Sequence, residues 1–578
     1  VREKRETVYQ SILPVAEQDY YSLSHAQKRL WVLHHMEECP IAYNMPGAFM
    51  LEGKLDKQAF QKSFEDLIQR HEILRTSFIT VEGQPRQKVL NKVEFHIEEI
   101  DLRVDKETIP ENGLLKQHAE QEAQTPFDLG KAPLLRVKLL HISETRYLLL
   151  STIHHIIADG WSLDVLAGEL SSLYKSHAFN EHNHLETLPL QYKDYTAWHN
   201  ELLESEGIRA DREYWHSKLS GEIPVLDIPT DYTRPPVQTY QGSIHLFQIS
   251  EALTEDLNAL NSRYGVSLFM SLMALVKVLF YRYTGQEDII IGAPIAGRQH
   301  RELDGQVGFY VNTLVLRDVI SGEDCFVEVL DKIKRTATEA YDHQIYPFDR
   351  LVEELDLRRD LSRSPLFDVL LVLQNKQETQ FELPGVTITP FEYSTTISKF
   401  DLTWYFTETE NVIQVGIEYN TALFTDARIE RMSAHFLELL KGIVSDANRK
   451  VEQHNILSEH EKSQVLYNFN NTGIEYSREK TIVDLFEEQA SLVPENVAVV
   501  FEERKLTYKE LNEQANQVAC YLRDKRQIRS DDLVGVMLDR SEEMIVALLG
   551  ILKSGAAYVP IDPEYPRERL AFMIKDSG

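Results

Sequence analysis

The sequence predicts a mixed α/β (α+β) protein of several domains, and three observations support this fold class. Short apolar runs rich in β-branched residues, such as 146–153 and 288–294, predict buried strands. Longer stretches with apolar residues at helical spacing, such as 57–70 and 268–283, predict helices between them. The length of 578 residues corresponds to three or four domains at about 150 residues each.

The composition is that of an ordinary globular protein, with 43% hydrophobic and 26% charged residues. The net charge of −30 argues against nucleic acid as a partner, because phosphate binding needs a basic surface. No apolar run approaches about 18 residues, so we expect no transmembrane helix and no membrane partner. The chain starts at Val1 without a signal-peptide pattern, which indicates a piece of a longer protein.

Cysteine usage points to a reducing environment. Cys39, Cys325 and Cys520 lie far apart and form no CxxC pair. A disulfide framework or a cysteine metal site therefore has little support, and we expect no bound metal. A cytoplasmic location fits this usage.

The first third of the chain is predicted to begin with a linker, because residues 1–18 are charged and aperiodic. Helices are expected over 24–33, with Ser24 as N-cap, and over 57–70. The second helix ends in a corner of dense charge, made of Arg70, His71, Glu72 and Arg75. Charges beside apolar residues usually have to pair, so this corner, including Arg75, is expected to be a structural ion-pair cluster.

An antiparallel hairpin is predicted next, from strands 134–141 and 146–153 joined by a short link. The hairpin delivers His154 and His155 to a connection that opens a helix, with Ser162 expected as its N-cap. Adjacent residues on a strand point to opposite faces. One imidazole can therefore face a substrate, and the other should point into the protein.

A second half is predicted from about residue 181, after a polar connection. Its expected elements are a helix from about 191, an extended Pro-rich loop at 227–237, helices at 268–283, 326–341 and 426–443, and strands at 288–294, 307–316, 367–373 and 412–419. From residue 457 the pattern changes. Helices and strands then alternate at 482–491, 497–501, 507–523, 533–537, 544–553 and 557–559, which predicts an α/β layer with some parallel sheet.

Seven segments resemble, in order, the core motifs of the condensation domain of non-ribosomal peptide synthetases. His154–Ser162 resembles the family's HHxxxDGxS motif. The others are SHAQKRLWVL at 24–33, RHEILRTSF at 70–78, the segment 192–198, GFYVNT at 308–313, and the segments 343–349 and 359–366. The resemblance covers about residues 20–450. It implies two lobes, each similar to chloramphenicol acetyltransferase, set in a V around a central tunnel.

Residues 470–578 resemble the start of an adenylation domain. The segments LTYKEL at 506–511 and LKSGAAYVPID at 552–562 are similar to its first two core motifs. The family's phosphate loop and later ATP and amino-acid pocket residues do not follow, so this partial α/β fragment is not expected to adenylate. The expected organisation is a linker from an upstream carrier domain at 1–18, a condensation N-lobe at 19–180, a condensation C-lobe at 181–453, a linker at 454–472 and a partial adenylation domain at 473–578.

The resemblance implies peptide-bond formation between carrier-bound thioesters. An upstream donor carrier and a downstream acceptor carrier would bring their substrates on phosphopantetheine arms, and this chain, lacking an LGGxS-like site, would hold no such arm itself. The acceptor amine would attack the donor carbonyl. The motif match assigns His155 as general base or amine positioner, because neutral imidazole suits that task near neutral pH. The backbone N–H of Gly160 is the candidate donor to the oxyanion.

The neighbouring residues are expected to have mainly structural roles. Asp159 is predicted to form an ion pair with Arg298 in preference to direct proton chemistry. His154 should be packed and hydrogen-bonded. Trp161 and Ser162 are expected to serve loop packing and helix capping. Asn312 and Tyr310 either line the tunnel or pack within a strand.

Several alternatives stay open at this stage. The first motif resembles the subtype that accepts an L-configured donor residue. An epimerization domain shares the histidine motif but usually closes a module, whereas an adenylation start follows here. A heterocyclization domain would carry DxxxxD in place of the histidines, and a free-standing acyltransferase using coenzyme A would not be fused to an adenylation start. A non-catalytic condensation-like docking platform is disfavoured by the intact histidine, Asp159 and Gly160.

Overall fold

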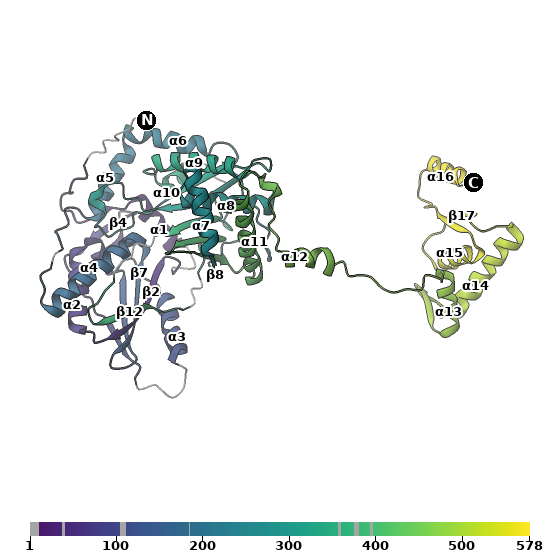
Figure 1. The fold of residues 1–578 in the computed structure, drawn as a ribbon, viewed down its shortest axis with the longest axis horizontal. Coiled ribbons are helices and arrows are strands. Elements are labelled where there is room, and N and C mark those ends of the chain that lie inside the picture. The colour runs from purple at the N-terminus through teal and green to yellow at the C-terminus, as the bar shows by residue number, and fades with distance from the viewer. Residues whose placement is uncertain are drawn as a thin grey trace. The chain divides into compact units, whose positions relative to one another are not determined.

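The computed structural model of the protein describes residues 11–36, 41–103, 111–183, 185–355, 360–374, 381–393 and 397–577. It divides into two compact units, Val1–Lys462 and Ser463–Gly578 (Figure 1). Cys39 and the first residue of the segment 359–366 lie outside the described residues. Each unit is described by itself.

The first lobe of the larger unit is built on a five-stranded sheet of order β12-β2-β7-β6-β5. Its strands are β2 (Asn44–Gly53), β5 (Glu98–Asp101), β6 (Leu135–His141), β7 (Arg146–His154) and β12 (Val386–Pro390). The helices of this lobe are α1 (His25–Met36), α2 (Lys57–Arg70), α3 (Glu111–Ala123) and α4 (Gly160–Phe179), and a small sheet joins β1 (Tyr21–Ser22), β4 (Gln84–Val89) and β3 (Thr76–Val81).

Side chains of β7 alternate between the two faces of this sheet, and each face packs against helices. Leu149 and Ile153 pack into one cluster with residues of α2 and α4. Leu148 and Leu150 pack into another with Leu115 of α3. Period-two alternation assigns His154 to the second of these faces. The predicted hairpin is confirmed, because β6 and β7 pair antiparallel from Leu135↔Ile153 to His141↔Tyr147.

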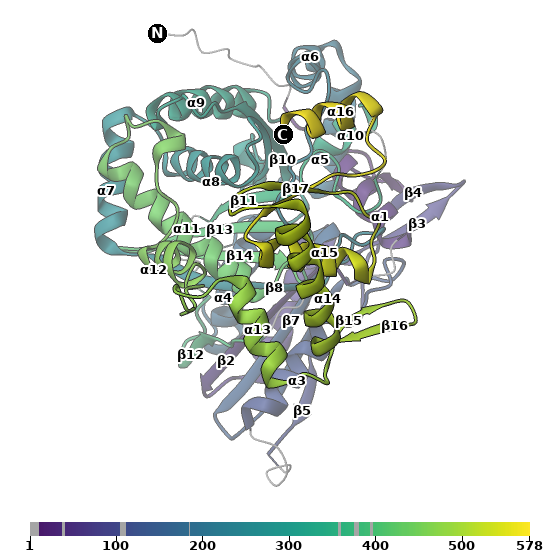
Figure 2. The same cartoon turned by 90° about the vertical axis from the view of Figure 1, so that its right-hand side faces the viewer.

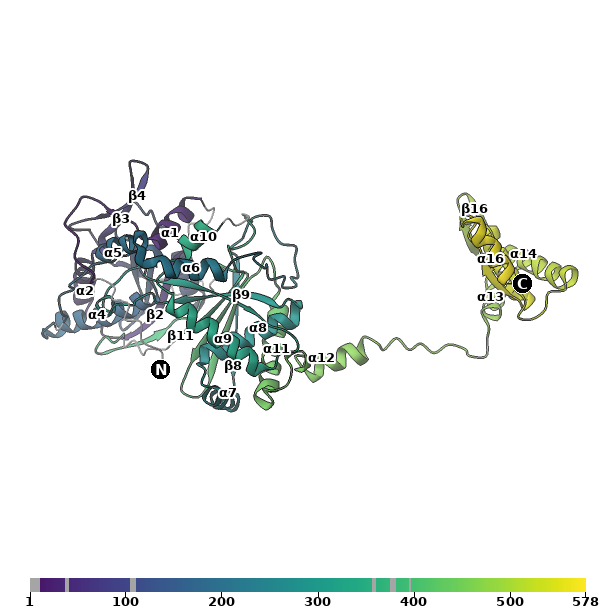
Figure 3. The same cartoon turned by 90° about the horizontal axis from the view of Figure 1, so that it is seen from above.

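The second lobe contains a six-stranded sheet of order β10-β9-β11-β13-β14-β8. Its strands are β8 (Gly242–Ile249), β9 (Asp288–Ile295), β10 (Asn312–Val319), β11 (Val369–Gln374), β13 (Leu402–Glu408) and β14 (Ile413–Asn420). Helices α7 (Glu251–Tyr264), α8 (Leu268–Thr284), α9 (Phe326–Asp342) and α11 (Asp426–Ser445) group beside this sheet in Figures 2 and 3. The remaining helices are α5 (Tyr192–Glu204), α6 (Arg209–Lys218) and α10 (Phe348–Glu354), with short 3-10 turns at Glu72–Arg75, His155–Ile157, Glu206–Ile208, Arg301–Leu303 and Val451–Gln453.

The apolar run of α8 is buried as its sequence predicts, with Leu272 to Phe280 inside the core of the second lobe beside Trp404. Among the described residues, no single helix is long and apolar enough to cross a membrane. The pair α7 and α8 meets that length and composition test only when the two helices are taken together, and they are bent by 107° at the break.

The expected boundary at residue 180 does not divide the larger unit cleanly in space, because a later strand joins the first sheet. Strand β12 comes from the second half of the chain, yet it pairs antiparallel with β2, from Val386↔Gly53 to Pro390↔Phe49. The edge of the first sheet is thereby completed by a distant segment, which supplies the hydrogen-bond partners that an edge strand lacks. Local sequence patterns carry no information about such a crossover.

The described part of the expected linker packs on the larger unit, since Ile12 is buried and the Val15 N–H donates to Asp194 Oδ1 at 2.8 Å. One local expectation needs correction. The strand expected over 307–316 begins only at Asn312, because residues 307–311 form an irregular loop with contacts to the first lobe.

The smaller unit alternates helices and strands as expected. Its elements are α13 (Ile482–Leu492), β15 (Val497–Phe501), β16 (Arg504–Thr507), α14 (Tyr508–Cys520), β17 (Leu533–Val536), α15 (Glu542–Ser554), β18 (Ala557–Pro560) and α16 (Arg567–Asp576), preceded by α12 (Glu459–Ser463) in the connection from the larger unit. Strands β17 and β18 pair parallel, as the alternation predicts, whereas β15 and β16 form an antiparallel hairpin.

Candidate active site

His154 and His155 separate at the end of β7, because the chain leaves the strand and enters a 3-10 turn between them. The His154 side chain is fully buried, and its Nδ1 accepts the Ile156 N–H at 3.1 Å. His155 is only half-buried at the residue level. The expectation that one ring points inward is confirmed for His154.

Two hydrogen bonds hold His155 in the turn, one from its backbone and one from its ring. Its backbone N–H donates to the Tyr43 carbonyl at 2.9 Å, and its ring Nδ1 lies 2.8 Å from the Ala158 carbonyl oxygen. A carbonyl oxygen only accepts, so Nδ1 carries the proton and Nε2 is the ring's acceptor. The ring also meets Phe309 of the second lobe edge to face, with centroids 4.8 Å apart.

Burial and positive charge keep the His155 ring neutral. Burial lowers its pKa to about 4, and the Lys399 ammonium contributes in the same direction. The bond to Ala158 and the Asp159 carboxylate oppose this shift. At neutral pH the site therefore offers an uncharged imidazole.

Asp159 is the N-cap of α4, which corrects the expectation that Ser162 caps this helix. The Asp159 carboxylate accepts the Ser162 N–H at 2.8 Å, the usual bond from an N-cap side chain to the third residue of a helix. The residue is fully buried. Its Oδ1 also lies 3.4 Å from Arg298 Nη2, and its Oδ2 accepts the Tyr310 N–H at 2.9 Å. The expected Asp159–Arg298 ion pair is thus present, and the carboxylate is committed to holding the two lobes together.

Ser162 and Trp161 also reach the second lobe. Ser162 Oγ lies 2.7 Å from Asp159 Oδ1 and 2.8 Å from the Gly308 carbonyl oxygen, and it accepts the Gly308 N–H at 3.1 Å. The Trp161 Nε1–H donates to the Asp304 carbonyl at 2.9 Å. Both residues therefore join α4 to the loop before β10, a role beyond packing within their own loop.

Arg298 is the counterpart of Asp159 in the second lobe. It donates to the carbonyls of Leu303 and Gln306 and to Ser162 Oγ, and its guanidinium lies 4.1 Å from the Tyr310 ring centroid. These contacts fix the loop that carries Phe309 against the His155 turn.

Gly160 begins α4 directly after the Asp159 cap. It is exposed, and a Cβ added there would meet nothing within 4 Å. A helix N-terminus presents N–H groups without intrahelical partners. A developing negative charge could therefore approach the chain closely at this residue.

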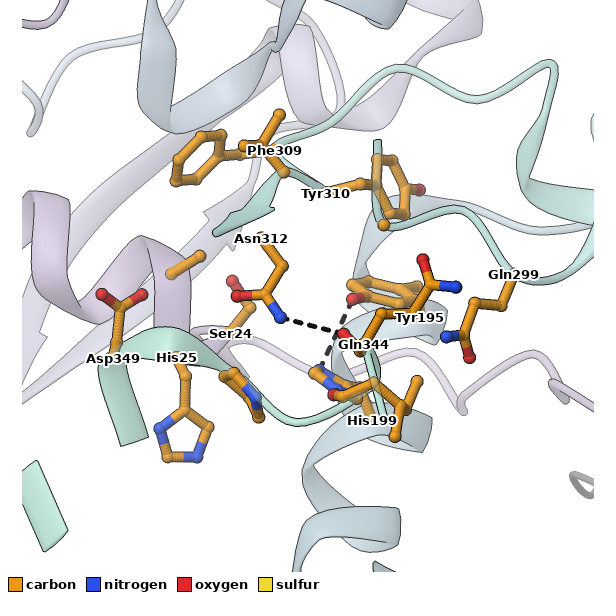
Figure 4. A pocket seen from close by; sticks show the side chains of 15 residues that line it. Ser24, His25, Tyr195, His199, Gln299, Phe309, Tyr310, Asn312, Gln344 and Asp349 are labelled. Carbon is orange, nitrogen blue, oxygen red and sulfur yellow. Dashed lines mark hydrogen bonds between the residues drawn. The ribbon is translucent and has the colours of Figure 1, made fainter. Parts of the chain in front are cut away.

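Tyr310 and Asn312 line a cavity together with α1, α5 and the segment 344–349, as Figure 4 shows. The Asn312 amide donates to the carbonyls of Gln344 and Tyr346. The Tyr310 hydroxyl donates to Gln306 Oε1 at 2.6 Å, and burial raises its pKa well above the ordinary value. Both residues border the cavity while their side-chain polar atoms bond to protein groups.

A second cavity also lies where the two lobes meet. It is lined by Asn44 and Pro46 of β2, and by Lys399, Tyr405 and Glu418 of the second lobe. Each cavity includes one neighbour of His155: Phe309, whose ring meets the His155 ring, lines the first, and Lys399, whose charge acts on His155, lines the second. Both cavities are lined by both lobes, and His155 itself lines neither.

Arg75 belongs to a different part of the molecule. It pairs with Glu72 at 3.6 Å and donates to the Leu90 carbonyl. In the same corner, His71 Nε2 and Arg70 Nε lie 2.6 Å and 3.0 Å from Glu169 Oε2. The predicted structural ion-pair cluster is confirmed.

Sequence reasoning missed Phe309 and Lys399. Phe309 lies within the GFYVNT segment, so a closer look at its aromatic residue could have found it. Lys399 stands in no motif that was singled out, and only the folded chain places its charge near His155. Among the described residues, no group of three or more His, Cys, Asp or Glu side chains could hold a metal ion.

Comparison with protein families matches residues 17–466 to the condensation domain and residues 486–578 to an AMP-binding enzyme. Gramicidin S synthase 2 of Brevibacillus brevis is 43% identical over 570 residues, covering 99% of this chain and 12% of that protein. Bacitracin synthase 3 of Bacillus licheniformis is 42% identical over 577 residues, covering 100% of this chain and 9% of that protein. The chain therefore spans about a tenth of the length of these relatives.

Solved structures show the same fold. A four-domain non-ribosomal peptide synthetase bound to AMP and glycine matches with a TM-score of 0.85 at 24% identity, covering 99% of this chain and 44% of that one. The first condensation domain of the CDA synthetase matches with a TM-score of 0.61 at 18% identity, covering 76% of this chain and 99% of that one.

Proposed function

The chain belongs to the condensation domain family, joined to the start of an AMP-binding enzyme domain, and from this premise we propose that it forms peptide bonds in non-ribosomal peptide synthesis. The observation that carries the proposal is that His155 has one neighbour in each of two cavities lined by both lobes, Phe309 in the first and Lys399 in the second. We propose that two substrates, one entering through each cavity, meet at this imidazole.

The reaction needs few groups from the protein. The acceptor amine attacks the donor thioester carbonyl, the C–N bond forms, and the C–S bond breaks as the thiol leaves with a proton. Holding both substrates at one point supplies much of the rate enhancement. Since a thioester is already activated, no covalent intermediate on the protein is required.

His155 is proposed to act on the amine through Nε2. An imidazole with a pKa of about 4 is a weak base at neutral pH, since an efficient general base has a pKa near the working pH. This favours amine positioning, in which Nε2 accepts a hydrogen bond from the amine and orients its lone pair. The proton would then leave as the tetrahedral intermediate collapses.

The Gly160 N–H is proposed to stabilise the oxyanion. It is exposed at the start of α4, where the helix dipole favours negative charge. Asp159, Ser162 and Arg298 are proposed to hold this N-terminus and the Phe309 loop in register. His154, Trp161, Tyr310, Asn312 and Arg75 are proposed to support the fold without touching the reacting atoms.

The substrates are proposed to arrive on the phosphopantetheine arms of an upstream donor carrier and a downstream acceptor carrier. The donor residue is proposed to be L-configured, because the first motif reads SHAQKRLWVL. The rest of the AMP-binding domain would be a further partner, and the setting would be cytoplasmic. The proposal includes neither nucleic acid nor a membrane.

A transfer assay with separately loaded carriers tests the proposal. Donor and acceptor carriers are mixed with the chain, and intact-protein mass spectrometry follows the donor mass onto the acceptor. We expect transfer by the wild-type chain and by His35→Ala, whose ring lies on α1 and bonds to the Trp31 carbonyl. We expect His155→Ala to lose transfer by at least a hundredfold.

Three results would reject this assignment. Transfer near the wild-type rate by His155→Ala would remove His155 from the chemistry. No transfer by the wild-type chain, with deuterium exchange at the α-carbon of a carrier-bound residue, would indicate epimerization. Carrier binding without either reaction would indicate a docking platform.

A further inference from the structure

Four buried side-chain polar atoms near His154 have no hydrogen-bond partner among the described residues. They are His34 Nδ1, Asn44 Oδ1, Thr152 Oγ1 and His154 Nε2. Thr152 and His154 are fully buried. Leaving one such group unpaired is costly, so four together call for an explanation.

The fold makes these four residues neighbours. Asn44 of β2 lies directly opposite His154 of β7 in the antiparallel register, so the two side chains stand side by side on one face. Thr152 is two residues from His154 on the same strand and therefore shares that face. The His34 ring of α1 meets the His154 ring edge to face, with centroids 5.7 Å apart.

Their hydrogen-bonding roles are complementary. His154 Nδ1 accepts the Ile156 N–H, so its Nε2 carries the proton and is a donor. The Asn44 amide nitrogen donates to the carbonyls of Ala123 and Thr125, which assigns Oδ1 as an acceptor. The Thr152 hydroxyl can do either, and His34 Nδ1 can accept. Donors and acceptors are thus present in one buried group.

We propose that His34, Asn44, Thr152 and His154 form an internal hydration site, in which one or two water molecules bridge these four polar atoms. A buried water molecule typically makes about three hydrogen bonds to groups that would otherwise be unsatisfied. Asn44 also lines the cavity that contains Lys399, whereas His34, Thr152 and His154 do not line it.

The hydration site makes His34, Asn44 and Thr152 positioning residues for His155. An acceptor at Nε2 fixes His154 in the Nε2–H tautomer, which leaves Nδ1 free to accept the Ile156 N–H. In the other tautomer, His154 Nδ1 would carry a proton that faces the Ile156 N–H. The hydrogen bond between these two groups would then be lost. Since Ile156 follows His155 in the same 3-10 turn, the tautomer of His154 determines how firmly His155 is held.

The tautomer of His154 is measured on the full chain, labelled with ¹⁵N-histidine, in two-bond ¹H–¹⁵N correlation spectra. We expect the Nε2–H form in the wild-type chain. We expect His34→Leu to weaken this preference, and His34→Asn, whose amide reaches the position of Nδ1, to restore it. The matched control is His35→Gln on the same helix: its ring packs against His34, with centroids 5.5 Å apart, but it supplies none of the four polar atoms, so the His154 tautomer should stay unchanged. An Nδ1–H tautomer in the wild-type chain, or equal spectra for His34→Leu and His35→Gln, would overturn the proposal.

Thr152→Val gives a second test, because the direction of the change in melting temperature depends on whether water bonds to the Thr152 hydroxyl. This change removes the hydroxyl and keeps the shape. If water bridges the hydroxyl, the melting temperature falls, as it should in the calibrating variant Thr76→Val, which loses a bond of 2.7 Å to the Glu72 carbonyl. If the hydroxyl is unpaired, Thr152→Val raises or preserves the melting temperature, and the proposal fails.

One further measurement rests on the proposed function. We expect His34→Leu to lower the rate of carrier-to-carrier transfer about tenfold at saturating substrate, whereas His35→Gln keeps the wild-type rate. A wild-type chain without transfer would reject the proposed function, but it would leave the tautomer and melting experiments valid as tests of the hydration site.

Discussion

At the scale of single residues, the site is organised around an imidazole that stays neutral. Burial is the main cause of the low pKa of His155, and the charge of Lys399 adds to it. The Nδ1 bond to Ala158 fixes the tautomer, so Nε2 remains as the acceptor. A neutral acceptor can hold a neutral amine without competing with it for a proton.

The ionisation of His155 can be followed by NMR titration of its ring. We expect a pKa of about 4, against the ordinary 6.5, and a higher value in Lys399→Met because one cation is removed. Between pH 6.5 and 4 the unfolded chain takes up a proton at this residue and the folded chain does not. This contribution to stability is therefore complete above about pH 6.5 and is lost as the pH falls towards 4. A titration midpoint near 6.5 would show that the ring is solvated and would contradict the prediction.

At the scale of elements, the start of α4 combines a buried cap with an open backbone position. Asp159 caps the helix and bonds across to Tyr310, whereas Gly160 faces open space. The loop before β10 shows the opposite situation at Gly308, where an added Cβ would lie 2.0 Å from Tyr192 Cδ2. The two glycines therefore serve different purposes: Gly160 leaves the backbone accessible, and Gly308 makes room for the Tyr192 ring.

Alanine substitutions separate these purposes. We expect Gly160→Ala to keep the melting temperature, because the new methyl meets nothing, and to reduce transfer if the donor carbonyl must approach this backbone. We expect Gly308→Ala to be destabilised by about 1–3 kcal/mol, the usual cost of overpacking, since Tyr192 is held by bonds to Ser24 and Phe309. Chemical denaturation measures both. Equal stability of the two variants would contradict this distinction.

At the scale of the whole larger unit, the two lobes are joined by buried polar contacts as well as by the crossover of β12. Asp159 and Arg298 are 139 residues apart in sequence and meet at 3.4 Å, with side chains that are 0% and 1% exposed. Arg29 of α1 and Asp349 of α10 make another contact between the halves at 2.9 Å. The relative position of the lobes is therefore fixed by specific pairs.

Removing both members of the buried pair should cost less than the sum of the costs of removing each one. We expect Asp159→Ala to lose roughly 3–5 kcal/mol, because Arg298 is left buried without its partner. Asp159→Asn should lose less, since its oxygen can still cap the Ser162 N–H. The double variant Asp159→Ala with Arg298→Met should be less destabilised than the sum of the single variants, as measured by denaturant unfolding. Unchanged stability with lost transfer in Asp159→Asn would instead place Asp159 in the chemistry.

Much of the fold follows from local patterns. Helix α2 matches the predicted range at both ends, and α8, β9 and α11 differ from the predicted ranges by one or two residues at their ends. These elements have strong apolar periodicity, which depends only on neighbouring residues. The helix cap was predicted wrongly because Ser162 and Asp159 are both good N-cap residues, and only the backbone geometry distinguishes them.

The sequence by itself determined the order of the elements and the residues of one short turn, because His154, His155, Asp159 and Gly160 are neighbours in the chain. The tertiary structure decided what those residues contact. Phe309, Arg298 and Lys399 reach the turn from more than 130 residues away, and Asn44 meets His154 only through strand register. Local spacing records which side chains share a face, whereas the burial, pKa and partners of a side chain depend on distant segments that only folding brings together.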